Sequence, residues 1–141
     1  MRPVTYTHID RIPAPRDQVY AIITDPKRIG EWLPGCAAVE SNSPFKRGAR
    51  MTAHFGDRVT EFEVVDMNPG RTFGWIEHGQ RTGAKLFFRL DQAGDATSIT
   101  IQIVWKPRSL VAWIKGRFFS KRNVQRQVNK TLENLRKLLG C

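Results

Sequence analysis

The chain has 141 residues, of which 40% are hydrophobic and 26% are charged, and its formal net charge is +10. This length and composition suit one domain, 1–141, with a packed core, and no window holds the roughly 18 uncharged apolar residues that span a bilayer. The N-terminus lacks the apolar run of a secretory signal, so we expect a cytoplasmic protein. The three histidines stand far apart and no Cys/His spacing resembles a zinc site, so no metal or cofactor is expected.

The first part of the chain predicts a strand followed by two short helices. Residues 4–12 are rich in β-branched side chains and alternate in polarity, as strands do. A short amphipathic helix is expected after the IPAP break, and the Asp-Pro dipeptide at 25–26 ends it, because the residue before a proline avoids helical angles. Residues 27–33 are expected to form a second helical turn, in which Trp32 fills the space between the small helices and the sheet.

The middle of the chain predicts further strands in antiparallel pairing. Segments with a period of two are separated by turn-forming residues such as Asn68-Pro69-Gly70. Connections this short join antiparallel neighbours. The predicted strands are 36–42, 49–55, 58–66, 72–78, 82–91 and 97–105.

The last segment predicts a long helix over 109–139. It contains no proline, and Val124, Val128, Leu132 and Leu135 recur at helical spacing. A sheet beside one long helix buries one face against it. The predicted fold class is therefore α+β, with about seven antiparallel strands around the C-terminal helix and two short helices after the first strand.

Four stretches carry a resemblance to a known superfamily. They are IPAPRDQVYAIITDPKRIGEWLPG, VVDMNPGRTFGW, DATSITIQIVWKP and the closing helix. Together they resemble the SRPBCC or START-like helix-grip superfamily, and within it the polyketide cyclase/dehydrase group. LPGC followed by AAVES also resembles the branch associated with carbon monoxide dehydrogenase, although Trp32 and the very basic helix depart from that branch.

The resemblance implies a curved sheet wrapped around the C-terminal helix, with a cavity between them for a small apolar ligand such as a lipid, a quinone or a polyketide. Ligand cavities need mostly apolar walls, and the strand alternation offers such walls on one face. The alternative is plain core packing of the same side chains. The residues expected to line the cavity are Trp32, Met51, Phe55, Phe62, Phe73, Trp75, Phe88, Ile101, Ile103, Trp105 and Trp113.

Three ionisable residues are weak catalytic candidates. Glu77 follows Phe73 and Trp75 on the same predicted face, where burial would raise its pKa and suit it to acid/base work; alternatively it reaches water at the strand end. His8 and Asp10 are two apart and point to one side of the first strand. They form either an internal polar pair or, as we prefer, a solvated edge with the neighbouring threonines buried.

The positive charge is concentrated at the C-terminus. From residue 108 onward nine Lys or Arg residues accompany one acid, Glu133, whereas the rest of the chain holds fourteen basic and twelve acidic residues. In LVAWIKGRFFSKR, apolar and basic side chains together resemble a membrane-facing surface. The expected membrane-facing residues are Lys115, Arg117, Phe118, Lys121 and Arg122.

Two alternative roles for the basic helix stay open. The charges also suit the solvated face of an amphipathic helix, and clustered Lys and Arg can bind nucleic acid. No recognised nucleic-acid motif is present, so we do not expect that partner. The leading functional hypothesis is a non-enzymatic carrier or sensor of an apolar ligand, peripheral to a membrane. The competing hypotheses are a polyketide cyclase/dehydrase-type enzyme and a scaffold whose partner protein the sequence does not identify.

Overall fold

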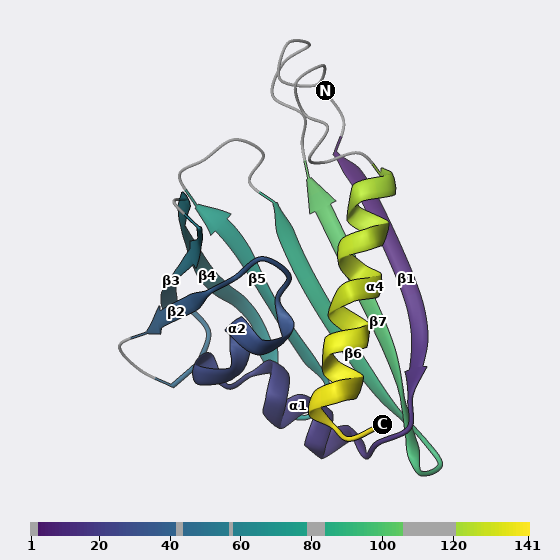
Figure 1. The fold of residues 1–141 in the computed structure, drawn as a ribbon. Helices are drawn as coiled ribbons and strands as arrows, with labels where there is room; N and C mark the ends of the chain where they lie inside the picture. The colour runs from purple at the N-terminus through teal and green to yellow at the C-terminus, as the bar shows by residue number, and fades with distance from the viewer. Residues whose placement is uncertain (1–2, 42–43, 57, 79–83, 106–120) are drawn as a thin grey trace.

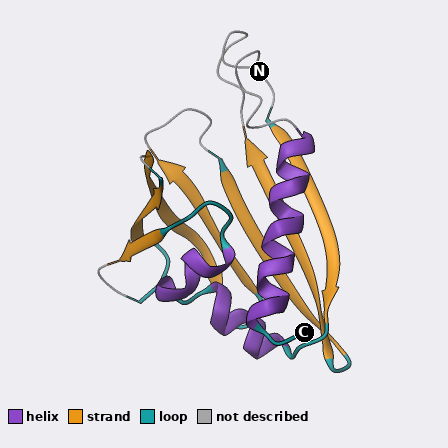
Figure 2. Cartoon of the chain, viewed as in Figure 1, coloured by secondary structure: helices purple, strands orange, loops and turns teal. Residues whose placement is uncertain are grey.

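One sheet and the helices on one of its faces make up the fold (Figures 1 and 2). The computed structural model describes residues 3–41, 44–56, 58–78, 84–105 and 121–141. The sheet has seven antiparallel strands in the order β1-β7-β6-β5-β4-β3-β2. Its strands are β1 (Val4–Ile12), β2 (Ala38–Ser41), β3 (Arg50–Phe55), β4 (Arg58–Asn68), β5 (Thr72–His78), β6 (Lys85–Ala93) and β7 (Ala96–Trp105). The helices are α1 (Arg16–Ile23), the short 3-10 helix η1 (Pro26–Arg28), α2 (Ile29–Trp32) and α4 (Lys121–Leu138).

These elements confirm the predicted α+β helix-grip fold. β1 and β5 have the predicted bounds, while β4 continues to Asn68 beyond a bulge between Val64 and Asp66. At this bulge the pairing register between β4 and β5 shifts, and pairing resumes at Asp66. β2 is shorter than predicted, and β6 begins at Lys85 and ends at the tight turn before Ala96. The predicted helix 109–139 is confirmed from Lys121 to Leu138, and its residues 109–120 lie outside the described part of the chain.

Short-range chemistry explains the turn between the small helices. The Asp25 side chain accepts a hydrogen bond from the Lys27 backbone N–H at 3.0 Å, and Pro26 occupies the first helical position of η1. A proline there loses no hydrogen bond, because that N–H would be unpaired anyway. Helix α1 therefore ends at Ile23, and η1 begins at Pro26. This short connection brings Trp32 onto the inner face of the sheet.

Helix α4 covers the sheet through a single apolar stripe. Val124, Val128, Leu132 and Leu135 are buried at helical spacing, as predicted. In Figure 1 the yellow helix α4 crosses in front of the sheet, with α1 near one end of the sheet and α2 beside α4 on the same face. None of the helices in the described part of the chain is long and apolar enough to cross a lipid bilayer.

The inner face, turned toward α4, matches the predicted register on the central strands. Phe73, Trp75, Phe88 and Ile101 are all buried, with at most 2% of their surface exposed. Cross-strand pairing sets them beside one another, since Phe88 lies opposite both Phe73 and Ile101. This part of the prediction is confirmed.

The preferred interpretation of β1 is wrong. Thr5 and Thr7 are exposed, whereas His8 and Asp10 are half-buried and lie opposite the inner-face residues Ile101 and Ile99. β1 is an edge strand, but α4 still covers its inner side: Arg136 of α4 reaches Asp10 at 3.0 Å. The internal polar pair was therefore the better alternative.

Asp10 links α4 to β1 electrostatically. Burial works to raise the pKa of Asp10, but the hydrogen bond from the Arg11 backbone N–H, the ion pair with Arg136 and the nearby His8 outweigh it, so the pKa lies below its ordinary value. Arg136 also donates a hydrogen bond to the Arg11 carbonyl oxygen at 3.1 Å. This pair fixes the last turns of α4 against the sheet edge.

Replacing Asp10 with asparagine is expected to give a pH-dependent loss of stability. A carboxyl whose pKa is lowered by folding stabilises the protein above its unfolded pKa, and this contribution disappears as the pH falls through the folded pKa. The side chain is 36% exposed, so solvent screening limits the loss to at most about 1 kcal/mol at pH 7. Urea unfolding of both proteins should give a difference near neutral pH that shrinks as the pH falls below about 4 and vanishes only below the lowered pKa of the folded protein. If the two free energies of unfolding still differ in acid, the loss of stability comes from packing and not from the charge.

Candidate functional site

An aromatic cluster occupies the inner face of the sheet. Its members, connected ring to ring, are Trp32, Phe45, Phe55, Phe62, Phe73, Trp75 and Phe88. At its centre the Trp32 and Trp75 rings stack with centroids 5.7 Å apart at an interplanar angle of 21°. Phe88 meets the Trp32 ring edge to face at 5.4 Å. Such pairs are worth about 0.5–1.5 kcal/mol beyond the area that they bury.

Trp32 is held in this cluster from two sides. Its side chain is fully buried, as predicted, and it ends the four-residue helix α2. The Asn134 side-chain amide of α4 donates a hydrogen bond to the Trp32 carbonyl oxygen at 3.1 Å. The sheet rings therefore hold the indole, while α4 holds the backbone of the same residue.

The inner face is not equally buried along its length. Near α1 the inner-face residues Ile12, Leu90 and Ile99 are fully buried. At the opposite end Trp105 is buried, but six other inner-face side chains are only half-buried. We call these six residues the half-buried end; they are Val4, Tyr6, Phe55, Glu77, Leu86 and Ile103. The register sets three of them side by side, since Ile103 lies opposite both Tyr6 and Leu86.

The predicted ligand-facing residues fall into three groups. Trp32, Met51, Phe62, Phe73, Trp75, Phe88, Ile101 and Trp105 are buried, Phe55 and Ile103 belong to the half-buried end, and Trp113 lies outside the described residues. All the described ones but Trp32 lie on strands, and the register places them on the inner face. A ligand-lining role for them stays a prediction.

The ionisable candidates are not gathered at one point. Glu77 is half-buried at the end of β5, opposite Phe62. His8 and Asp10 lie across the sheet on β1, with 3.7 Å between His8 Nε2 and Asp10 Oδ2. Asp10 is in addition paired with Arg136 of α4.

Several residues of the site were missed from the sequence. Tyr6 shares its side of β1 with Val4 and Ile12, and counting three apolar residues on that parity would have identified the inner face. Phe45 lies in a connection between strands, yet it is buried and stacks on Phe73 with centroids 5.5 Å apart. No local pattern marks such a loop residue as core.

The predicted basic surface is described only in part. Lys121 and Arg122 are exposed at the start of α4, while Lys115, Arg117 and Phe118 lie outside the described residues. Glu133 pairs with Lys130 at 3.4 Å and Lys137 at 3.2 Å. Within the described part of the chain, by contrast, Lys121, Arg122 and Arg126 have no ion-pair partner.

Comparison with known proteins agrees with this architecture. The family model described as "Polyketide cyclase / dehydrase and lipid transport" matches residues 3–140. The chain belongs to this family. Among curated protein sequences, none matches the chain significantly.

Several solved structures share the fold of this chain at low sequence identity. A conserved protein from Geobacillus kaustophilus has a TM-score of 0.78 at 14% identity, covering 97% of this chain and 95% of that one. The Zhui aromatase/cyclase from Streptomyces sp. R1128 has a TM-score of 0.71 at 14% identity, covering 98% and 96%. Ara h 8.0201 has a TM-score of 0.73 at 9% identity, covering 97% of each chain. At these identities the likeness shows the helix-grip fold and nothing finer.

Proposed function

We propose that this protein binds a small apolar ligand, of the lipid, quinone or polyketide-like class, between the inner face of the sheet and α4. The observation that carries the proposal is the incomplete burial of apolar side chains at the half-buried end. Phe55, Leu86 and Ile103 lie on the inner face with the core residues, yet part of their surface stays exposed. Protein cores normally pack without gaps, so inner-face apolar surface that remains exposed suits a ligand of the same chemistry.

Two adjacent residues of β7 offer a matched test. Ile103 lies opposite Tyr6 and Leu86 on the inner face, whereas its half-buried neighbour Val104 lies opposite Thr5 and Lys85 on the outer face. Ile103→Gln is expected to weaken binding of the neutral fluorescent probe N-phenyl-1-naphthylamine roughly tenfold, because an amide replaces apolar contact surface. Val104→Gln should leave the affinity within about twofold. Equal losses in the two variants, or no binding by the wild type, would contradict the proposal.

The natural ligand can be sought directly. Organic extraction of the purified protein followed by mass spectrometry is expected to release an apolar compound from the wild type and less of it from Ile103→Gln. The same compound in equal amount from both proteins would place its binding elsewhere.

The exposed cations at the start of α4 support a membrane-surface location for this binding. Lys121, Arg122 and Arg126 are exposed, and no acidic side chain in the described chain pairs with them, so their charges are not offset locally. Each basic group near such a surface contributes about 1 kcal/mol. We place the start of α4 against anionic lipid head groups while the half-buried end takes up or releases the ligand.

Vesicle co-sedimentation tests this location. Replacing Lys121, Arg122 and Arg126 together with glutamine is expected to reduce binding to anionic vesicles at least roughly tenfold, and added salt should reduce wild-type binding similarly. The matched control is Lys130→Gln with Lys137→Gln, because Glu133 already offsets those charges; its loss should be smaller. Equal wild-type binding to neutral vesicles would contradict a role for the charge.

A second candidate function, a cyclase or dehydrase acting on an aromatic polyketide-like substrate, is favoured by His8. This imidazole lies on the inner face, and its ring lies parallel to that of Tyr6 at 6.4 Å. With Glu77 it gives the inner face two groups able to transfer protons. Chemical change of a bound compound that is lost in His8→Ala, with binding retained, would favour the enzyme over the carrier.

A further inference from the structure

The indole N–H of Trp32 is a buried donor that finds no acceptor in the described part of the chain. Trp32 has 0% of its surface exposed, and its Nε1 has no hydrogen-bond partner among the described residues. Buried indole N–H groups normally have a partner, since an unpaired buried donor costs about 1–3 kcal/mol. Two other buried atoms of the described chain lack a hydrogen-bond partner, Arg16 Nε and His54 Nε2, but both side chains are only half-buried, and His54 Nε2 lies 3.5 Å from Glu40 Oε1.

The surroundings fix this donor in place. The ring stacks on Trp75 and meets Phe88 edge to face, and the carbonyl of the same residue is bound by Asn134. A rigid donor loses little entropy when an acceptor arrives. The indole therefore has the properties of a preorganised contact rather than of a side chain free to turn toward solvent.

The chemistry of the neighbours limits what the acceptor can be. The Trp75 and Phe88 rings carry no charge to compensate a buried anion, which makes a carboxylate or phosphate oxygen unfavourable. A lone water molecule needs two to four polar partners, and aromatic rings do not supply them. A neutral oxygen on a molecule whose remaining surface is apolar meets both conditions.

We infer that the Trp32 Nε1–H donates a hydrogen bond to a neutral carbonyl-type oxygen of the ligand, and that the ligand is a ketone, quinone or ester with an otherwise apolar, ring-bearing body. This inference rests on the proposed function and narrows its ligand class. The stacked rings of the aromatic cluster provide the surface for the apolar body. The indole N–H provides the one polar contact that fixes its orientation, as apolar binding sites commonly do.

Matched probe pairs that differ by one carbonyl test the inference. The pairs are 9-fluorenone with fluorene and 1-tetralone with tetralin, and binding is measured by calorimetry. Replacing Trp32 with 3-benzothienylalanine, which keeps the ring shape and lacks the N–H, is expected to weaken binding of each ketone roughly tenfold, the value of one hydrogen bond. Binding of each hydrocarbon should change less than about twofold, because the apolar contacts remain.

A second measurement needs no substitution at the site. In ¹⁵N-labelled wild-type protein, the Trp32 indole N–H signal, assigned by its absence in Trp32→Phe, should move downfield and exchange more slowly with solvent when 9-fluorenone is added. Fluorene should produce neither effect.

The outcomes separate this inference from the proposed function. Equal losses for ketone and hydrocarbon, or an indole signal that responds alike to both, would overturn the assigned donor while leaving apolar binding intact. Failure of all four probes to bind the wild type would overturn the inference together with the proposed function.

Discussion

Replacing Trp32 with alanine is expected to lower the free energy of unfolding by about 3–5 kcal/mol. The indole is fully buried, and it joins α2 to the sheet through its ring contacts with Trp75 and Phe88. Removing it deletes apolar contact area and leaves a space that the rigid neighbouring rings cannot fill. Urea unfolding followed by circular dichroism gives the value.

The matched control for this substitution is Ile9→Ala on β1. Ile9 is 67% exposed, so its truncation should change the free energy of unfolding by no more than about 0.5 kcal/mol. Trp32→Phe, which keeps one aromatic ring, should fall between the two. A loss of less than about 1 kcal/mol in Trp32→Ala would mean that α2 contributes little to holding the helices on the sheet, and would remove the structural basis for a fixed indole.

The central strands show why so much of the fold could be predicted. Phe73 and Trp75, like Phe88 and Leu90, follow a strict period of two, and one face of an antiparallel sheet must be buried when a long helix lies beside it. Helix α4 was equally predictable, because Val128 and the apolar residues at helical spacing from it form a single apolar stripe. Both patterns are local, so no knowledge of distant contacts was needed.

The first strand shows where the local pattern is ambiguous. Val4 to Ile12 mixes polar and apolar residues on both sides, and Asp10 on the buried side contradicts the usual preference of carboxylates for water. The contradiction disappears only when Arg136, from the far end of the chain, is placed beside it. A tertiary ion pair of this kind leaves no trace in the spacing of either element.

The candidate site depends still more on long-range contacts. That Trp32 would be buried could be argued from its break between helices. Its stacking on Trp75, and the lack of an acceptor for its N–H among the described residues, depend on where α2 docks. The half-buried end is likewise a property of the assembled sheet, since Leu86 and Ile103 resemble ordinary core residues in the sequence. Residue types thus identified the inner-face residues, while their degree of burial required the fold.

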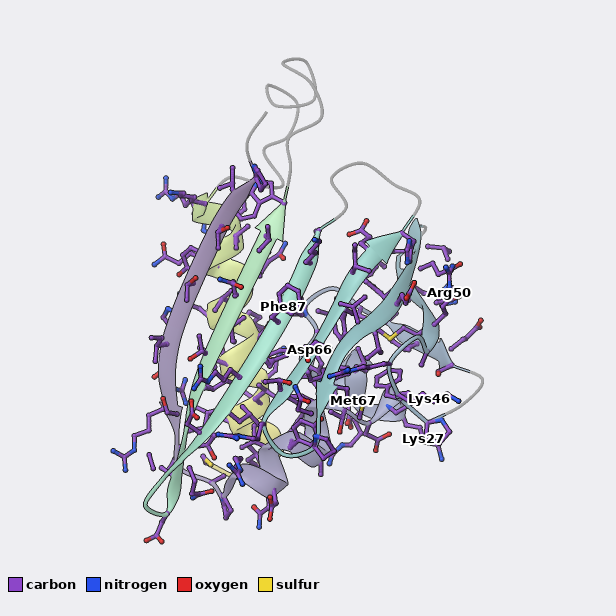
Figure 3. All side chains as sticks on the ribbon, turned by 180° about the vertical axis from the view of Figure 1, so that it is seen from behind. Lys27, Lys46, Arg50, Asp66, Met67 and Phe87 are labelled. Atoms are coloured by element: carbon purple, nitrogen blue, oxygen red, sulfur yellow. The ribbon has the colours of Figure 1, made fainter. Side chains whose placement is uncertain are left out.

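A second substitution with a large expected effect lies on the outer face of the sheet. Gly74 on β5 pairs with Phe87 on β6, and Figure 3, viewed from behind, shows the Phe87 side chain on the face away from α4. A Cβ added at Gly74 would lie 2.4 Å from Phe87 Cδ1 and 3.0 Å from the Leu86 carbonyl oxygen. We expect Gly74→Ala to lower the free energy of unfolding by about 1–3 kcal/mol, because the ring must move and the strands cannot separate without losing hydrogen bonds.

A double-mutant cycle identifies the cause of this effect. In a Phe87→Ala background the ring is gone, so Gly74→Ala should become nearly neutral, or stabilising by up to about 1 kcal/mol through the lower entropy of the unfolded chain. The coupling between the two positions should then exceed about 1 kcal/mol. If Gly74→Ala is as harmful without the ring as with it, the Leu86 carbonyl is the obstacle, and the glycine is required by the backbone of β6 rather than by the aromatic side chain that covers it.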